Sequence, residues 1–483
     1  MSLIKNKINS GNGLLKNASL NVIRQAFMLT FSLVTFPYVS RILGDESYGK
    51  YSFATTVIEY LLIFSGSASG VYAIREGARL KNDKNRLRAF SSEIFSIGCL
   101  FTLIAYFILN GLATFWPKLY DKKVLLYILG VRIIGTTIGV EWIFNIFEDY
   151  KNLTIRQFFV QGIGLLLTFM LVHSENDTNL YAVATAVAMS GVNFVNFFIS
   201  RKYVKYKIVK SLNLKTHLKP ILMMLFYSAM VTIYSNSDII MLGIMKDDST
   251  VGIYSVSVKV YGVVKGVFIA ALSVLLPRIS MYLGNNEICR LKTVINKTLN
   301  VLLVGLIPSI VLLIFYAKTV IGIIAGADYL KGETSLQLLS IALFFALVGS
   351  LLTTNIMIPN RQESIITIIV SVSAISNIVL NYFLIPFGGA NSAAFTTVIA
   401  ELIVCLGAII YSKEYIDWKN MNRLCMKVLI PTIVMIIALL AIKRLKMNYI
   451  PEFIIGTVVS CVSYILCLRV IIVLSTAKAK RIH

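Results

Sequence analysis

The sequence Arg41-Ile-Leu-Gly-Asp-Glu-Ser-Tyr-Gly-Lys-Tyr-Ser52 lies between two long apolar segments near the start of the chain. These segments, residues 18–39 and 51–73, are each long enough to cross a bilayer as a helix, since the hydrocarbon core is about 30 Å thick. The residues between them therefore predict a short loop that joins two membrane helices. The second helix contains Ser65-Gly-Ser-Ala-Ser-Gly70, a run of small residues that favours close helix packing and also allows a bend.

This unit of two helices and a loop recurs 203 residues later in the chain. When residues 45–75 are aligned with residues 248–278 without gaps, eight positions are identical, more than so apolar a composition gives by chance. The pattern predicts an internal duplication, an arrangement that is common in transporters. The identical pairs are Asp45 and Asp248, Gly49 and Gly252, Tyr51 and Tyr254, Ser52 and Ser255, Val57 and Val260, Ala68 and Ala271, Val71 and Val274, and Arg75 and Arg278.

The composition excludes a soluble globular protein. The chain has 483 residues, of which 57% are hydrophobic and only 14% are charged, whereas soluble domains have about 25% charged residues. Apolar runs long enough to span a membrane recur from end to end, so the sequence predicts an all-α polytopic membrane protein with about fourteen transmembrane helices. They are expected near residues 18–39, 51–73, 91–115, 123–146, 154–173, 179–200, 219–244, 251–275, 299–317, 335–358, 364–386, 391–411, 425–442 and 450–474.

The expected spans form two pseudo-symmetric six-helix bundles, residues 18–200 and 219–411. A basic cytoplasmic linker, residues 201–218, separates the two bundles. Residues 425–474 are predicted to be an appended transmembrane helix pair, because they have no counterpart in the repeat. Residues 1–17 have leucine and isoleucine between basic residues, which predicts an amphipathic segment along the cytoplasmic membrane surface.

The net charge of +23 follows from membrane topology. With the N-terminus in the cytoplasm, about 30 of the 46 Lys and Arg residues lie in cytoplasmic segments, as the positive-inside rule requires. We therefore expect a multi-pass protein of the bacterial cytoplasmic membrane with both termini in the cytoplasm. The charge needs no nucleic-acid partner, and contact with anionic lipids is a secondary role that it supports.

The sequence has none of the patterns that indicate an enzyme. It contains no Gly-Lys-Ser/Thr phosphate loop and no serine elbow. The six cysteines have no paired spacing, and the three histidines (His173, His217 and His483) are expected in loops or at the terminus, which does not suit a catalytic metal. We therefore expect a transporter without a cofactor, driven by a coupling ion (H⁺ or Na⁺) or by the membrane potential.

Ionisable side chains inside the predicted spans are the candidate functional residues, because each costs roughly 2.5–3.5 kcal/mol at a helix centre. Arg24 in the first span shares one helix face with Asn21 and Gln25, and Glu59 lies in the second span. Such residues can form internal salt bridges, for example between Arg24 and Glu59, or they can line a hydrated anion site in which arginine binds phosphate. The further candidates are Arg132, Glu141, Asp238, Lys259, Lys265 and Glu401.

The chain resembles a family of polysaccharide flippases. The resemblance rests on Arg24, on the loop Pro37-Tyr-Val-Ser-Arg-Ile-Leu-Gly-Asp-Glu-Ser-Tyr-Gly-Lys-Tyr51 and on Arg75-Glu-Gly-Ala-Arg79. Gly252-Ile-Tyr-Ser255 and residues 355–361 resemble the second half of the same family. The family comprises the O-antigen and capsule repeat-unit flippases of the multidrug/oligosaccharidyl-lipid/polysaccharide exporter superfamily. The resemblance covers roughly residues 12–411, and its motifs are diffuse.

The resemblance implies two six-helix bundles around a cationic cavity, which open alternately to the two sides of the membrane. The implied substrate is an undecaprenyl-diphosphate-linked oligosaccharide, and a polysaccharide polymerase and assembly proteins are possible partners. The diphosphate would meet the cationic and polar residues, and the acidic residues would act in gating or ion coupling. The first group comprises Arg24, Arg132, Lys259, Lys265, Asn21 and Gln25, and the second comprises Glu59, Asp238 and Glu141.

Three alternatives stay open at the level of sequence. Fourteen spans are also found in the lipid II flippases of the same superfamily, but basic residues are sparse in the first helices of this chain. A multidrug or cation antiporter should have an acidic, aromatic chamber, whereas four of the eight candidate charges named above are basic. A membrane scaffold without transport activity has no need for charge in the middle of the membrane.

Overall fold

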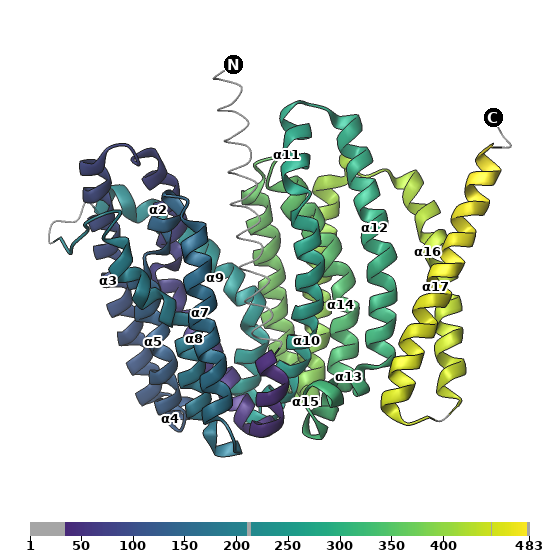
Figure 1. Cartoon of the computed structure of the whole chain (residues 1–483), viewed down its shortest axis with the longest axis horizontal. Coiled ribbons are helices and arrows are strands. Elements are labelled where there is room, and N and C mark those ends of the chain that lie inside the picture. Colours follow the sequence, from purple (N-terminus) through teal and green to yellow (C-terminus); the bar gives the residue numbers. More distant parts are fainter. Residues whose placement is uncertain (1–33, 210–213, 446, 481–483) are drawn as a thin grey trace. The chain divides into compact units, whose positions relative to one another are not determined.

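The computed structural model describes residues 34–209, 214–445 and 447–480, and these residues form helices without any strand (Figure 1). This confirms the predicted all-α class. Within these ranges, ten helices are long and apolar enough to cross a membrane. The number is lower than fourteen partly because two predicted spans form one continuous helix assignment over Glu363–Tyr415, and because most of the first predicted span lies outside the described ranges.

The first part of the chain consists of a helix over residues 34–62 and ten further elements. These are η1 (Ile63–Ser67), α2 (Ala68–Arg79), α3 (Lys84–Phe115), α4 (Pro117–Tyr120), α5 (Lys123–Gly139), α6 (Glu141–Ile146), α7 (Tyr150–Leu171), η2 (Glu175–Asp177), α8 (Thr178–Ser200) and α9 (Leu214–Met245).

The second part contains eleven elements. These are α10 (Asp248–Ser273), α11 (Leu276–Gly284), α12 (Ile288–Phe315), α13 (Ala317–Ile324), η3 (Ala327–Gly332), α14 (Glu333–Leu352), η4 (Thr353–Met357), α15 (Glu363–Ser412), η5 (Lys413–Tyr415), α16 (Trp418–Lys443) and α17 (Tyr449–Lys480).

The chain forms two compact units, Met1–Gly252 and Ile253–His483. The first unit includes α9, which packs on α2 and η1. The predicted second bundle, residues 219–411, begins within this helix. The reason for the observed grouping is visible in the packing around His217, described below.

Each unit, taken by itself, has a similar order of helix contacts. In the first unit α3 packs on α5, α5 packs on α8, and α7 packs on α8. In the second unit α12 packs on α14 and α14 packs on α15. The long helix α15 breaks at Gly389, where φ is +51°, and its two arms pack on each other through the hydrogen bond from Ser373 Oγ to the Ala400 carbonyl oxygen, which is 2.7 Å long. The break falls between the predicted spans 364–386 and 391–411.

Two local features also repeat. Glu148 and Arg361 both have a left-handed backbone, with φ of +59° and +58°, each just before a long helix. The next residue in each case donates its N–H to the carbonyl oxygen five positions earlier, Asp149 to Phe144 and Gln362 to Met357, both at 3.0 Å. This is the hydrogen bond of a Schellman helix end. The duplication therefore extends to the turns between helices.

The equivalent tyrosines Tyr51 and Tyr254 have corresponding neighbours. The ring of Tyr51 lies 4.5 Å from the ring of Tyr181 at the start of α8. The hydroxyl of Tyr254 lies 3.2 Å from Thr397 Oγ1 in the second arm of α15. Each tyrosine thus contacts the last long helix of its own half, which supports the internal duplication.

A loop was predicted over Arg41–Ser52, but these residues are helical on both sides of a single break. Residues 34–62 are assigned as helix, and Gly44 alone among them has a positive φ, of +68°. Glycine adopts this conformation without the steric cost that a Cβ brings, so a break at one residue replaces the longer loop that was expected. A second break lies at Ser65, whose ψ of −173° interrupts η1 within the predicted small-residue run.

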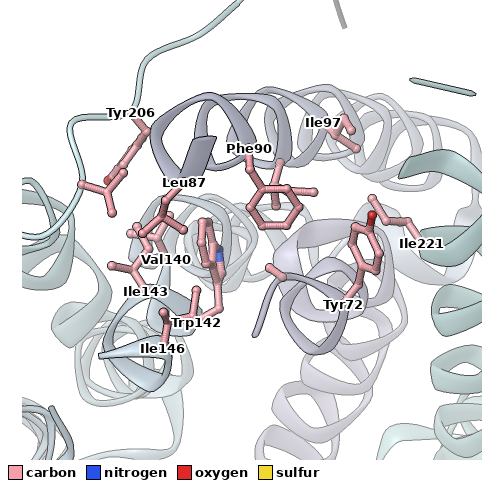
Figure 2. Packing of buried hydrophobic residues seen from close by; sticks show 13 residues of the cluster. Tyr72, Leu87, Phe90, Ile97, Val140, Trp142, Ile143, Ile146, Tyr206 and Ile221 are labelled. Carbon is pink, nitrogen blue, oxygen red and sulfur yellow. The ribbon is translucent and has the colours of Figure 1, made fainter. Parts of the chain in front are cut away.

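An apolar cluster joins α2, α3, α6 and α9 in the first unit (Figure 2). It contains Tyr72, Phe90, Trp142 and Ile221, each less than 9% exposed. Van der Waals packing of these side chains holds the four helices together.

His217 lies beside this cluster in α9, so the prediction of a loop position was wrong for this residue. Its Nδ1 lies 2.9 Å from the Tyr72 hydroxyl and its Nε2 lies 2.7 Å from Glu93 Oε2. The cluster and these bonds hold α9 against α2 and α3, which explains why α9 belongs to the first unit.

The C-terminal helices α16 and α17 pack on each other and on α12. Tyr464 donates a hydrogen bond of 3.0 Å to the Val304 carbonyl oxygen. Tyr316 contacts α17 where Gly456 leaves room, because a Cβ on Gly456 would lie 2.9 Å from the Tyr316 ring carbon Cζ. The predicted appended helix pair is therefore attached to the second unit.

Candidate functional site

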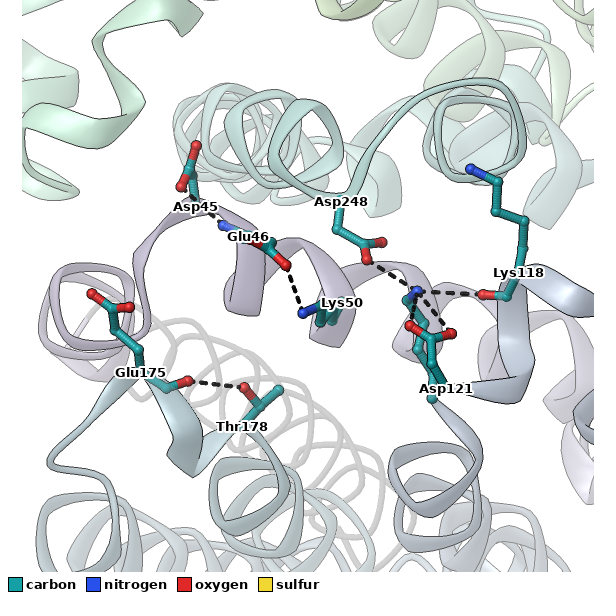
Figure 3. A network of polar contacts seen from close by, with 9 residues as sticks. Asp45, Glu46, Lys50, Lys118, Asp121, Glu175, Thr178 and Asp248 are labelled. Atoms are coloured by element: carbon teal, nitrogen blue, oxygen red, sulfur yellow. Dashed lines mark hydrogen bonds and ion pairs between the residues drawn. The ribbon is translucent and has the colours of Figure 1, made fainter.

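The two copies of the repeated loop pack directly on each other in the first unit (Figure 3). A Cβ added to Gly49 would lie 2.7 Å from the carbonyl carbon of Asp248. A Cβ added to Gly252 would lie 2.9 Å from the carbonyl carbon of Asp45. Real Cβ atoms do not approach backbone so closely, so only glycine allows this contact at either position.

The contact has approximate twofold symmetry. Gly49 and Gly252 are equivalent in the repeat, and so are Asp45 and Asp248, and each glycine faces the aspartate of the other copy. Such a self-complementary arrangement is the geometry of an isologous interface, here formed within one chain. We refer to these four residues as the glycine contact.

Polar bonds surround the glycine contact. Lys122 Nζ lies 3.0 Å from Asp248 Oδ2 and 3.1 Å from Asp121 Oδ2, and its side chain is only 6% exposed. Ser249 Oγ donates a hydrogen bond to Asp45 Oδ2. Lys118 Nζ donates to the carbonyl oxygen of Lys246 at 3.0 Å. A buried ammonium with two carboxylate partners fixes Asp248 against the α4–α5 turn within the first unit.

Asp247 orders the turn that precedes α10. The backbone N–H of Thr250 donates to Asp247 Oδ1 at 2.9 Å. Hydrogen bonds from the side chain and the backbone N–H of Thr250 hold the pKa of Asp247 below its usual range. The carboxylate form of Asp247 is therefore favoured by the folded state.

A second site lies within the first unit, where three helices bring Arg132, Glu59 and Asn236 together. Arg132 Nη2 in α5 lies 3.9 Å from Glu59 Oε1, and Asn236 Nδ2 in α9 donates to Glu59 Oε2 at 3.4 Å. The side chain of Arg132 is 12% exposed and that of Glu59 is 38% exposed. Two predicted site residues therefore meet, joined by Asn236, which was not among the candidates although it lies in the polar run before Asp238.

Arg132 keeps free donor capacity in this site. Its Nη1 is buried and has no hydrogen-bond partner among the described residues. A guanidinium has five N–H donors, and a buried donor left unpaired costs about 1–3 kcal/mol or more. The ion pair is long and Nη1 is unpaired, so Arg132 is able to bind an anionic ligand that has several acceptor oxygens.

Asp238 and Glu141 are placed differently from this trio. Asp238 is half-buried in α9, two residues beyond Asn236, so the two side chains point in nearly opposite directions around the helix. Glu141 is the first residue of α6, directly after Val140, whose φ of +38° breaks the helix between α5 and α6. Glu141 therefore lies at a helix break, whereas Asp238 lies within the continuous helix α9.

In the second unit Lys265 is bound by Glu401. Lys265 Nζ lies 2.7 Å from Glu401 Oε1, and the Tyr261 hydroxyl donates to the same oxygen at 2.9 Å. The side chain of Glu401 is only 6% exposed, and these two bonds compensate its buried charge. This geometry favours the packing role for Lys265 over a substrate contact. Lys259 lies six residues earlier in α10 and is half-buried, and Arg24, Asn21 and Gln25 lie outside the described residues.

The fold defines a multi-pass membrane protein made of two related helical units with buried charge. Residues 14–283 match the model of the polysaccharide biosynthesis protein family, and the chain belongs to that family. It is 22% identical over 376 residues to a putative O-antigen transporter of Escherichia coli (strain K12), covering 77% of this chain and 90% of the relative. A putative O-antigen transporter of Shigella dysenteriae is 21% identical over 396 residues, covering 81% of this chain and 98% of the relative.

Solved structures share the fold. The lipid II flippase MurJ in an inward closed conformation has a TM-score of 0.76 at 17% identity, with 93% of this chain and 98% of that chain covered. A multidrug resistance MATE family transporter of the MOP superfamily, in an inward-facing conformation, has a TM-score of 0.58 at 14% identity, covering 82% and 94% of the two chains. At these identities the likeness shows a common fold.

Proposed function

We propose that the protein is a flippase that moves undecaprenyl-diphosphate-linked oligosaccharide repeat units from the cytoplasmic to the outer leaflet for synthesis of a surface polysaccharide. Membership of the polysaccharide biosynthesis family supports this proposal, as do the O-antigen transporters that match most of the chain. The fold shared with transporters of the MOP superfamily supports transport as the activity.

The observation that carries the proposal is the state of Arg132. Its side chain is 12% exposed, its contact with Glu59 is 3.9 Å long, and its Nη1 has no bond within the described part of the chain. A diphosphate offers several acceptor oxygens, and the planar guanidinium of arginine can donate to two of them in bidentate fashion. On this proposal the diphosphate replaces Glu59 at Arg132, and Arg24, Asn21, Gln25 and Lys259 supply further contacts.

In this proposal Glu59 links binding of the diphosphate to binding of a coupling cation. When the diphosphate takes its place at Arg132, Glu59 loses its cationic neighbour and, among the described residues, keeps the hydrogen bond from the amide of Asn236. A carboxylate that has lost its cationic partner can bind a coupling cation in its place. Glu59 is therefore our candidate for the coupling group, with Asp238 and Glu141 as gating residues, and the membrane potential as the alternative driving force.

The glycine contact is our candidate for the closed end of the transport path. Alternating access requires a contact that forms in one state and opens in the other. The glycine contact joins the repeated segments by backbone packing and a few polar bonds, so it can separate without unfolding either helix. We place the protein in the bacterial cytoplasmic membrane with both termini in the cytoplasm, where a polymerase and assembly proteins would use its product.

Transfer between leaflets tests the proposal directly. The full-length protein is reconstituted into proteoliposomes that contain the lipid-linked oligosaccharide of its host in the inner leaflet. We expect the sugar to become accessible to an added glycosidase, and to stay inaccessible with Arg132→Ala inserted at the same level. Transfer of lipid II at the same rate would instead assign the protein to peptidoglycan synthesis, and transfer of neither lipid would contradict the proposal.

A further inference from the structure

A groove of about 820 Å³ runs along the second unit between the end of α10, α11 and the first half of α12. One part of its wall is apolar, with Leu272, Leu275 and Leu302 beside Phe268, and with Gly305 at the end of the stretch on α12. We call it the α10–α12 groove. Its lining residues all belong to a single compact unit.

Three cationic side chains lie along the other part of the wall. They are Arg278 in α11 and Arg290 and Lys297 in α12, and all three are exposed. The only neighbouring carboxylate in an ion pair with them, among the described residues, is Glu287, whose Oε2 lies 2.7 Å from Arg290 Nη1. Arg278 donates from Nε to the Tyr282 hydroxyl at 3.2 Å. Three positive charges against one negative charge leave a net positive wall.

The spacing along α12 matches one leaflet of a bilayer. At 1.5 Å per residue, Lys297 and Gly305 are about 12 Å apart along the helix, and Arg290 and Gly305 are about 22 Å apart. Half of a hydrocarbon core is about 15 Å thick. When Arg290 and Lys297 lie at the level of the headgroups, the Gly305 end of the groove therefore lies among the acyl chains.

We infer that the α10–α12 groove binds an anionic phospholipid, with its phosphate among Arg278, Arg290 and Lys297 and an acyl chain along Leu272 and Leu302. Charge complementarity selects an anionic headgroup, and the apolar wall selects a lipid over free phosphate. The remaining polar side chains, Tyr282, Thr293 and Thr298, offer too few hydrogen-bonding groups to select an oligosaccharide. This favours a bulk phospholipid over a sugar-linked lipid, and the inference does not depend on the proposed transport activity.

Cys289 gives a direct probe because it is exposed and lines the groove. The full-length chain is prepared with Cys99, Cys405, Cys425, Cys461 and Cys467 changed to Ala, so that Cys289 alone reacts with a maleimide. The labelling rate is measured in detergent with increasing phosphatidylglycerol. We expect phosphatidylglycerol to slow the reaction in a saturable manner, while phosphatidylcholine and inorganic phosphate leave the rate unchanged.

A charge-deleted variant and a matched control separate the headgroup contact from general effects. Each basic residue near a lipid surface contributes about fivefold to affinity. The triple variant Arg278→Gln, Arg290→Gln and Lys297→Gln should therefore raise the phosphatidylglycerol concentration for half-protection by about 100-fold. Lys292→Gln removes a positive charge from the same helix outside the groove, and it should change this concentration less than twofold.

Several outcomes overturn the inference. Equal protection by phosphatidylcholine, or full protection of the triple variant, would show that headgroup charge plays no part. Protection by undecaprenyl diphosphate alone would assign the groove to a polyprenyl lipid, and protection by inorganic phosphate would make it an anion site. If the cysteine variants fail to fold, native mass spectrometry of the wild-type chain with the same lipids decides the question, because binding without preference for phosphatidylglycerol contradicts the inference.

Discussion

Replacing Gly49 or Gly252 by alanine should open the glycine contact. The added methyl group would lie 2.7 Å from the Asp248 carbonyl carbon in one case and 2.9 Å from the Asp45 carbonyl carbon in the other. Carbon atoms pack best at about 3.5–4.0 Å, so the two segments must separate by roughly 1 Å. The obstacle is backbone, which cannot rotate away. Overpacking of this kind costs about 1–3 kcal/mol, which shifts the equilibrium towards the open state by roughly 5- to 150-fold.

Hydrogen–deuterium exchange of the purified full-length protein measures this shift. Peptides covering residues 45–52 and 248–255 should exchange at least about fivefold faster in Gly49→Ala and in Gly252→Ala. The double variant should add little, because one separation relieves both overlaps. Gly262→Ala is the matched control: it lies in α10 with no atom within 4 Å of the added methyl group, and alanine favours helix.

Unchanged exchange in both glycine variants would refute the reasoning. It would mean that the segments separate or shift at no measurable cost, so the glycines would not be required for the contact. Faster exchange across the whole chain, with Gly262→Ala behaving in the same way, would show a general loss of stability and would equally remove the glycine contact from the mechanism.

Three further predictions follow from individual side chains. Arg132→Ala should abolish export at a normal insertion level, whereas Arg132→Lys should keep part of it; cell-surface polysaccharide is the measurement, and wild-type amounts in Arg132→Ala would contradict the assignment. Glu401→Gln should destabilise the protein by about 1–3 kcal/mol, because Lys265 keeps the Tyr261 hydroxyl but loses the negative charge of its partner, and adding Lys265→Met should restore much of the melting temperature; a double variant no more stable than the single one would argue against the pair. Asp247 has a lowered folded-state pKa, so its stabilisation is complete above the unfolded pKa of about 3.9 and is lost as pH falls through the lower folded value. Between pH 5 and 3 the melting temperature of the wild type should therefore fall more than that of Asp247→Asn. Parallel plots of melting temperature against pH for the two proteins would contradict this role of Asp247.

The repeat was visible in the sequence, but the contact that it makes was not. Gly49 and Gly252 are identical in the aligned copies, and nothing in the sequence says that each copy packs on the other. A periodic pattern reports which face of a helix is apolar, whereas close backbone packing depends on how two distant segments meet. The signal that could have indicated it was the conservation of glycine itself at both equivalent positions of the repeat.

Turns and buried polar residues were the hardest features to predict. A helix break at Gly44 alone stands where a longer loop was expected, because one glycine with positive φ is sufficient to interrupt the helix. His217 was expected in a loop because it follows a basic run, yet Tyr72 and Glu93 satisfy both of its ring nitrogens inside the first unit. Local composition carries no information on such distant partners.

The candidate site was predicted in part. Arg132 and Glu59 were both chosen as charges inside apolar spans, and the structure brings them together. The same criterion chose Lys265, whose bond to Glu401 gives it a partner within the second unit. Burial of charge indicates that a residue matters, but only the identity of its partner separates a ligand site from a salt bridge that stabilises packing.

The most direct test of the central claim is to deplete the protein in its own host and to measure undecaprenyl-linked lipids by mass spectrometry. The account predicts accumulation of a diphosphate-linked oligosaccharide, which disappears when the wild-type chain is restored and persists with Arg132→Ala. Accumulation of lipid II with lysis, or no change in either pool, would contradict it.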